Sequence, residues 1–291
     1  MATPAQWLAG ARPRTLPAAV SPIVAGSGAA YVAGHFSAAV AVLCLVVALA
    51  LQVGVNYAND YSDGIRGTDA VRVGPMRLVG SDAASPSAVK RAAFASFGIA
   101  AVAGVAVVWL SGEWWLLIVG AAAILAAWFY TGGKHPYGYL GLGELMVFVF
   151  FGLVAVMGTT YVQAHRVTAA SFVAAVAVGL VACQVLVANN LRDIAGDREV
   201  GKRTLATRLG DRGTRVLYLA MSVVVAVAIV LVAVLTSWWA LLGLGGVLVL
   251  AVATRSVMAG AVGRDLISVL QLTGMSELAM SFGLAIGWLI R

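Results

Sequence analysis

Long apolar segments dominate this chain and most constrain what it can fold into. Nine of them have the length, about 20 residues, that a helix needs to cross a bilayer. Their approximate limits are 16–34, 37–58, 89–111, 114–131, 142–163, 168–190, 214–236, 238–256 and 266–290. Only 11% of the 291 residues are charged, against roughly 25% in a soluble domain. The sequence therefore predicts a single all-α integral membrane domain over residues 1–291, in which nine transmembrane helices form one bundle around a central cavity.

The basic residues predict how these spans are oriented. If the N-terminus is cytoplasmic, nearly all of the 19 Lys and Arg residues fall in cytoplasmic segments, and only Arg166 and Arg291 fall outside. This asymmetry follows the positive-inside rule. We therefore expect a multi-pass protein of the cell membrane with a cytoplasmic N-terminus. Because the basic residues alternate with membrane spans, the net charge of +7 does not indicate a nucleic-acid partner.

The most carboxylate-dense stretch of the chain directly follows the second apolar segment. It runs from Asn56 to Asp69, and helical spacing places Asn56, Asn59, Asp60 and Asp63 on one face. Carboxylates gathered on one face repel one another unless a cation lies between them. The predicted orientation puts this face at the cytoplasmic boundary of the membrane.

A second cluster repeats the pattern at the end of the sixth apolar segment. Asn189, Asp193 and Asp197 follow one another at strict four-residue steps. With oxygen ligands only, Mg²⁺ is the natural cation, and it commonly bridges a few carboxylates to substrate phosphates. Basic residues surround both clusters: Arg66, Arg72 and Arg77 near the first, and Arg192, Arg198, Lys202 and Arg203 near the second. Together these groups suit a diphosphate, and the alternative is that they are ordinary solvated charges of loops.

A third polar stretch, from Tyr130 to Glu144, joins the fourth and fifth spans. Its five glycines allow the backbone to approach a ligand closely, with Tyr130 and Lys134 as candidate contacts. The alternative is a simple helix connection with interfacial tyrosines. Glu144 begins an apolar span, where helix capping and catalysis are both open. Glu277 lies inside the ninth span, where we expect a buried, hydrogen-bonded or protonated acid.

Four stretches resemble the UbiA-type intramembrane aromatic prenyltransferases, namely residues 11–19, 56–77, 130–144 and 189–206. The aspartate motifs resemble the superfamily as a whole. The Arg-Pro-Arg-Thr-Leu-Pro run near the start and the Gly-Leu-Gly-Glu turn are similar to the branch that prenylates 1,4-dihydroxy-2-naphthoate in menaquinone biosynthesis. The first motif of the superfamily is often written NxxxDxxxD, and this chain departs from it at Gly64, with Asp63 and Asp69 as candidates for the missing ligand.

The resemblance implies a Mg²⁺-dependent enzyme that transfers a polyprenyl group from polyprenyl diphosphate to 1,4-dihydroxy-2-naphthoate, with loss of CO₂ and diphosphate. It implies that the metal ligands are Asp60, Asp63, Asp69, Asp193 and Asp197. The implied diphosphate-binding residues are Arg77, Lys202, Arg203, Asn56 and Asn189. The residues expected to take part in catalysis are Asp60, Asp193, Lys134 and Tyr130.

Two alternatives stay open at this point. The same fold could act on another acceptor, such as 4-hydroxybenzoate, homogentisate, haem or chlorophyllide. A cation transporter would instead place its acidic residues near the middle of the spans, whereas both clusters lie at one face and only Glu277 is clearly within a span. The sequence indicates neither the prenyl chain length nor the oligomeric state.

Overall fold

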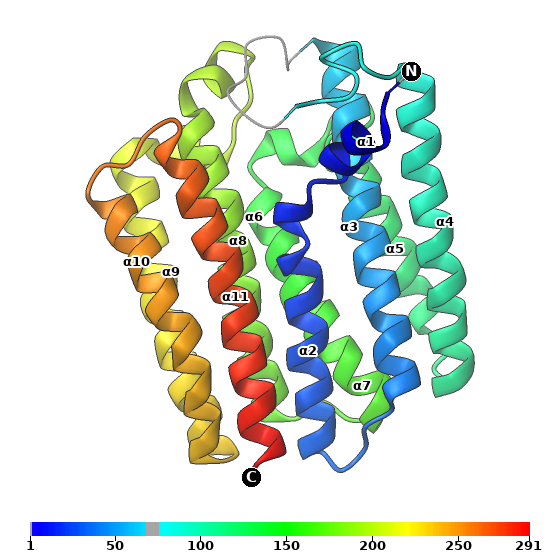
Figure 1. The fold of residues 1–291 in the computed structure, drawn as a ribbon, viewed down its shortest axis with the longest axis vertical. Coiled ribbons are helices and arrows are strands. Elements are labelled where there is room, and N and C mark those ends of the chain that lie inside the picture. Colours follow the sequence, from blue (N-terminus) through cyan, green and yellow to red (C-terminus); the bar gives the residue numbers. More distant parts are fainter. Residues whose placement is uncertain (1, 68–75) are drawn as a thin grey trace.

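The computed structural model describes residues 2–67 and 76–291, and every regular element in these ranges is a helix (Figure 1). The elements are α1 (Pro4–Ala11), η1 (Pro13–Thr15), α2 (Pro17–Val32), α3 (Ala38–Arg66), α4 (Pro86–Ser111), α5 (Leu116–Phe129), η2 (Tyr137–Leu140), α6 (Gly143–Val147), η3 (Phe148–Met157), α7 (Gly158–Ala164), α8 (Ala169–Glu199), α9 (Leu205–Leu235), η4 (Trp238–Gly243), α10 (Leu244–Met258) and α11 (Asp265–Leu289). The segment η3 is a π-helix that joins α6 to α7 in one continuous span.

Seven helical segments in the described part of the chain are long and apolar enough to cross a membrane. An eighth results if Pro4–Thr15 and Pro17–Val32, which are bent by 50°, form one broken span. The apolar helix α5 has 14 residues, or about 21 Å at 1.5 Å per residue, against a hydrocarbon core of about 30 Å. The prediction of an all-helical membrane protein is confirmed, and the count of nine spans stays a prediction.

Three helices extend beyond their predicted limits at the end that carries the polar clusters. The helix α3 continues from the expected residue 58 to Arg66, and α8 continues from 190 to Glu199. The helix α9 begins at Leu205 instead of 214, with a kink at Gly210. The prediction followed hydrophobicity, but backbone hydrogen bonds continue a helix through polar residues. Gly67 ends α3 because its φ of 71° lies in the left-handed region. Both clusters therefore lie on continuous helices.

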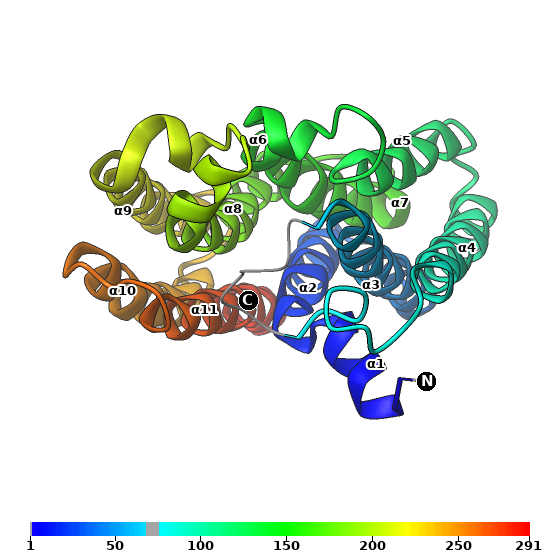
Figure 2. The ribbon, with the colours of Figure 1, turned by 90° about the horizontal axis from the view of Figure 1, so that it is seen from above.

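Viewed along the helices, the bundle has two rows (Figure 2). One row holds α10, α11, α2, α3 and α4, and the other holds α9, α8, α6 and α5. Helices pack closely where side chains are small: a Cβ on Gly152 of η3 would lie 2.7 Å from the Cα of Gly179 on α8. Glycine at these positions lets the two helices touch through their backbones.

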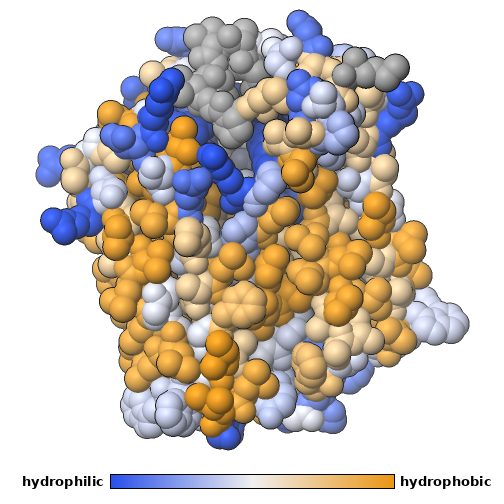
Figure 3. All heavy atoms as spheres, in the orientation of Figure 1, coloured by the Kyte–Doolittle hydropathy of each residue, from blue (hydrophilic) through white to orange (hydrophobic). Residues whose placement is uncertain are grey.

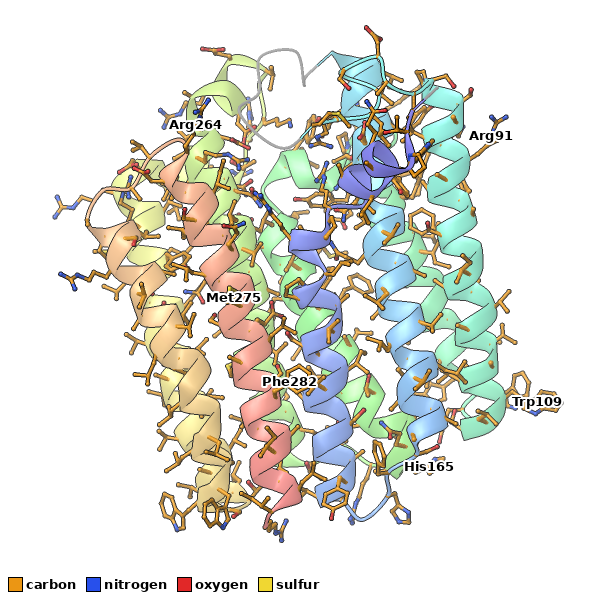
Figure 4. The ribbon with its side chains drawn as sticks, viewed as in Figure 1. Arg91, Trp109, His165, Arg264, Met275 and Phe282 are labelled. Atoms are coloured by element: carbon orange, nitrogen blue, oxygen red, sulfur yellow. The ribbon has the colours of Figure 1, made fainter. Side chains whose placement is uncertain are left out.

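The surface separates into an apolar body and a hydrophilic end. Figure 3 shows hydrophobic residues over the body of the molecule and hydrophilic ones mainly at the end near the N-terminus. Val102, Ile118 and Leu248 are each more than 70% exposed, and many other large apolar side chains are exposed as well. Such an extended apolar surface is rare in contact with water and is expected in contact with lipid. Arg91 and Arg264 lie at the hydrophilic end, far from His165 at the opposite end (Figure 4).

The core also contains a buried acid. Glu277 is 0% exposed in the middle of α11, and neither of its carboxyl oxygens has a hydrogen-bond partner among the described residues. The same holds for Oγ of Ser21, Oγ of Ser281 and Oε1 of Gln184. The expectation that Glu277 is buried is confirmed. It lies outside the lining of the main cavity.

Candidate functional site

A cavity of about 430 Å³ lies between the two rows of helices. Its walls come mainly from α2, α3, α5, η3 and α8, with smaller contributions from α4, α6 and α7. Aliphatic and phenylalanine side chains form most of the lining, including Val47, Leu51, Phe150, Val154 and Leu186. Polar residues of both clusters and of the Tyr130–Glu144 stretch also line it. The cavity therefore joins a long apolar compartment to a charged one.

From the first cluster, Asn56, Asn59 and Asp63 line the cavity, as their helical spacing predicts. Asn56 donates a hydrogen bond of 3.0 Å from Nδ2 to Oγ1 of Thr15. Asn59 Oδ1 accepts one of 2.7 Å from Oγ1 of Thr131. These bonds tie α3 to the N-terminal helix pair on one side and to the Tyr130–Glu144 stretch on the other.

Asp63 is the carboxylate of this cluster that faces the cavity. Its Oδ1 accepts a hydrogen bond of 2.7 Å from the hydroxyl of Tyr139. Its Oδ2 lies 3.5 Å from Nη2 of Arg77, which also lines the cavity. The residue is 3% exposed, so its charge interacts with these two partners more strongly than it would in water.

Asp60 has a different environment from the one we expected. It is 1% exposed, and its two oxygens accept hydrogen bonds from the backbone N–H groups of Leu78, at 2.7 Å, and Val79, at 3.0 Å. It is not among the residues that line the cavity. In this structure Asp60 holds the segment that carries Arg77 against α3. Asp69 lies outside the described residues.

The second cluster faces the cavity in full, because Asn189, Asp193 and Asp197 all line it. Asp193 forms a two-pronged pair with the neighbouring Arg192, with Nε–Oδ1 and Nη2–Oδ2 distances of 2.7 and 2.8 Å. Asp197 Oδ1 lies 3.9 Å from Nζ of Lys202, which also lines the cavity. The carboxylates of both clusters that face the cavity are thus already matched by basic groups.

The Tyr130–Glu144 stretch contributes Tyr130, Tyr137 and Tyr139 to the lining. Burial raises the pKa of Tyr137 to about 12, so its hydroxyl stays protonated and donates to the carbonyl of Ala126 at 2.8 Å. Lys134 is exposed and does not line the cavity, and Arg203 is likewise absent from the lining. The predicted catalytic and diphosphate-binding residues are therefore only partly gathered in one place.

Tyr139 is the contact that sequence reasoning missed. Besides bonding to Asp63, its ring lies under Nζ of Lys202, 4.4 Å from the centroid, and its carbonyl accepts from Arg203 N at 3.0 Å. Gly141 allows this approach: its φ is 79°, and a Cβ there would lie 2.8 Å from the Arg203 carbonyl oxygen. Tyr139 thus connects the first cluster to the second. The glycines made this stretch recognisable in the sequence. A turn has no helical periodicity, however, so the sequence does not indicate which of its tyrosines contacts the clusters.

The donor atoms of both clusters are carboxylate and amide oxygens, the chemistry that Mg²⁺ prefers. Within the described ranges, no group of three or more His, Cys, Asp or Glu side chains is arranged to hold a metal ion. Mg²⁺ is commonly bound through one or two carboxylates, with water and phosphate oxygens completing its shell. Asp63 on one side and Asp193 and Asp197 on the other fit that requirement.

Comparison with known proteins agrees with this geometry. The model of the UbiA prenyltransferase family matches residues 19–265, and the chain belongs to this family. It is 52% identical to the 1,4-dihydroxy-2-naphthoate octaprenyltransferase of Mycobacterium tuberculosis, over 98% of this chain and 97% of that protein. The Escherichia coli protein of the same name is 43% identical over 72% of this chain and 70% of its own length.

Solved structures show the same fold. A UbiA homologue from Aeropyrum pernix K1 superposes with a TM-score of 0.74 at 16% identity, covering 92% of this chain and 97% of that one. A UbiA homologue from Archaeoglobus fulgidus bound to GPP and Mg²⁺ gives a TM-score of 0.69 at 14% identity, over 96% and 99% of the two chains. At such low identity these likenesses concern the fold alone.

Proposed function

We propose that this protein transfers a polyprenyl group from polyprenyl diphosphate to 1,4-dihydroxy-2-naphthoate, releasing diphosphate and CO₂ and forming demethylmenaquinol, the reduced form of demethylmenaquinone. The observation that carries the proposal is 52% identity, over nearly the full length of both chains, to a protein named for this reaction. The cavity supports it, because an apolar compartment next to a charged one suits a substrate with a long hydrocarbon tail and a diphosphate head.

The oxygen donors of Asp63, Asp193 and Asp197, with the amides of Asn56 and Asn189, would hold Mg²⁺ in this reaction. Mg²⁺ supplies positive charge that stabilises the diphosphate as it leaves. The Archaeoglobus fulgidus homologue, which shares the fold, binds GPP together with Mg²⁺, and this supports a metal–diphosphate complex as the species that this chain would bind.

Arg77 and Lys202 line the charged end of the cavity and would bind the diphosphate oxygens directly. Negative charge grows on these oxygens as the allylic C–O bond breaks, and preorganised cations lower the energy of that state. The apolar walls exclude water from the allylic cation. Tyr130 lines the same cavity and is proposed to contact the substrates during the reaction.

Three predicted residues need a more specific proposal. We assign Asp60 to positioning Arg77, since it binds the backbone that follows Arg77. Lys134 stays a predicted catalytic residue and Arg203 a predicted diphosphate-binding residue, because Tyr130 and Lys202, which lie near them in the chain, line the cavity. They would meet charged substrate as it enters.

The proposed topology has nine spans, a cytoplasmic N-terminus and a cytoplasmic active site in the cell membrane. The hydrophilic end carries Arg91 and Arg264 (Figure 4), and the positive-inside rule assigns such an end to the cytoplasm. The short helix α5 would complete the ninth span. A cysteine-accessibility scan of residues 91 and 165 in intact cells tests this orientation, which requires labelling of residue 165 alone from outside.

The experiment for the function uses the purified protein with Mg²⁺, polyprenyl diphosphate and a panel of aromatic acceptors. Mass spectrometry should detect a decarboxylated, prenylated product from 1,4-dihydroxy-2-naphthoate. Product from 4-hydroxybenzoate or homogentisate alone would favour the alternative acceptor. Absence of any transfer, combined with cation-dependent flux in vesicles, would favour the transporter, for which membership of a prenyltransferase family gives no support.

A further inference from the structure

A side-chain pair between α6 and α8 lies beside the aspartate clusters and belongs to neither. Asn190 donates a hydrogen bond of 2.9 Å from Nδ2 to Oε1 of Glu144. Glu144 is 7% exposed, and its backbone carbonyl accepts from Sγ of Cys183 on α8, at 3.1 Å. Two contacts therefore fix the start of α6 against α8, and the first of them fixes the orientation of the Asn190 amide.

The Asn190 side chain lines the cavity, whereas Glu144 does not. Its amide nitrogen is used by Glu144, and no described residue donates a hydrogen bond to its carbonyl oxygen Oδ1. An amide held by its nitrogen offers its oxygen on the other side. Asn190 therefore provides a fixed hydrogen-bond acceptor for a molecule in the cavity.

The position of Asn190 along α8 indicates which part of a substrate it meets. Asn190, Asp193 and Asp197 have the spacing i, i+3 and i+7, so they share one face of the helix. Asn190 lies almost one turn before Asp193, about 4.5 Å along the axis on the membrane side of the cluster. If Asp193 and Asp197 bind the diphosphate of the prenyl substrate, Asn190 lies at the depth of the allylic carbon to which that diphosphate is bonded.

We propose that Asn190, oriented by Glu144, binds a phenolic hydroxyl of the aromatic acceptor through its carbonyl oxygen Oδ1. This inference rests on the proposed function, in which a hydroxylated ring must lie next to the allylic carbon. The phenol donates, the amide oxygen accepts, and the ring is placed for attack. Asn190 is thus a substrate-binding residue, and Glu144 is a positioning residue that acts through it.

Steady-state kinetics with each substrate varied in turn test the inference. Asn190→Ala should lower kcat/KM for the acceptor about tenfold, the loss of one hydrogen bond of about 1.4 kcal/mol. The KM for polyprenyl diphosphate should stay within about twofold of wild type, because the metal ligands are untouched. Glu144→Ala should lower kcat/KM for the acceptor by a similar factor. Glu144→Gln should keep most of the wild-type value, since the Oε1 of glutamine can still accept a hydrogen bond from Asn190.

A double-mutant cycle separates positioning from an independent role. Asn190→Ala combined with Glu144→Ala should be no worse for the acceptor than Asn190→Ala alone. Fully additive losses would show that Glu144 does not act through Asn190. An equal loss of kcat/KM for both substrates in Asn190→Ala would assign Asn190 to binding the metal and diphosphate. An unchanged kcat/KM for the acceptor would also overturn the proposal.

Gln163→Ala is the matched control, because it removes a buried amide that bonds to Ser37 and Ser27 away from the cavity lining. It should lower the unfolding temperature and leave both KM values unchanged. Calorimetric binding of 1,4-dihydroxy-2-naphthoate, with diphosphate and Mg²⁺ present, separates the two proposals. Wild-type binding without turnover would count against the proposed function, whereas equal binding by wild type and Asn190→Ala would count against this inference.

Discussion

Replacing Tyr139 with phenylalanine removes one hydroxyl from the contact between the two clusters. That hydroxyl donates 2.7 Å to Oδ1 of Asp63, and hydrogen bonds to charged groups contribute about 1.5–3 kcal/mol. The phenylalanine ring keeps its place under Lys202, so the cation–π contact at 4.4 Å is retained. The variant therefore isolates the orientation of a single carboxylate oxygen.

If Asp63 holds Mg²⁺, losing its hydrogen-bond partner should weaken the metal site. Substitution of a residue that orients a metal ligand typically costs about 10- to 100-fold in metal affinity or activity. In Tyr139→Phe we therefore expect the Mg²⁺ concentration for half-maximal prenyl transfer to rise about 10- to 100-fold. The assay is product formation at saturating substrates across a Mg²⁺ titration.

Tyr137→Phe is the matched control for this prediction. It also removes a tyrosine hydroxyl beside the cavity, but that hydroxyl donates to the carbonyl of Ala126. It should cost about 1 kcal/mol of stability and leave the Mg²⁺ dependence unchanged. A Tyr139→Phe enzyme with the Mg²⁺ dependence of wild type would refute the assignment of Asp63 as a metal ligand held by Tyr139.

Four further predictions concern acidic residues and the metal. Asp60→Asn replaces a carboxylate that accepts two backbone hydrogen bonds, so thermal unfolding should show a loss of about 1–3 kcal/mol; Asp63→Asn should instead abolish Mg²⁺-dependent turnover with a smaller change in stability. An ionised carboxylate without a partner would be too costly to keep in the core, so Glu277 is expected to be neutral. Glu277→Gln should therefore leave the unfolding temperature and the turnover near wild type. A large decrease in both quantities would show that Glu277 carries charge. Chelation with EDTA should stop prenyl transfer, and added Mg²⁺, but not K⁺, should restore it.

Hydrophobic length and helical spacing predicted most of what this fold contains. The regular four-residue steps of Asn189, Asp193 and Asp197 fixed a common face, and the structure places all three on the cavity. Helical periodicity indicates on which side of a helix a side chain lies, but not which residue it contacts there. Spacing placed Asp60 and Asp63 on one face, and the motif ranked Asp60 first, yet Asp60 binds the backbone near Leu78 and Asp63 faces the cavity.

The features that could not be predicted depend on contacts between distant segments. Tyr139 acquires its role from Asp63, 76 residues earlier in the chain, and from Lys202. The Glu144–Asn190 bond likewise joins segments 46 residues apart. Nothing in the local sequence of Tyr139 or Asn190 distinguishes it from its neighbours, because each depends on how α6 and η2 pack against other helices.

The ion pairs at the charged end of the cavity determine how the proposed metal–diphosphate complex would bind. Asp63, Asp193 and Asp197 are already matched by Arg77, Arg192 and Lys202. An incoming complex brings both charge signs, so the carboxylates can exchange their basic partners for the metal while Arg77 and Lys202 turn to phosphate oxygens. Binding is then an exchange of ion pairs with little change in the number of unpaired charges. Free Mg²⁺ or free diphosphate alone completes only half of this exchange, and the two should therefore bind cooperatively.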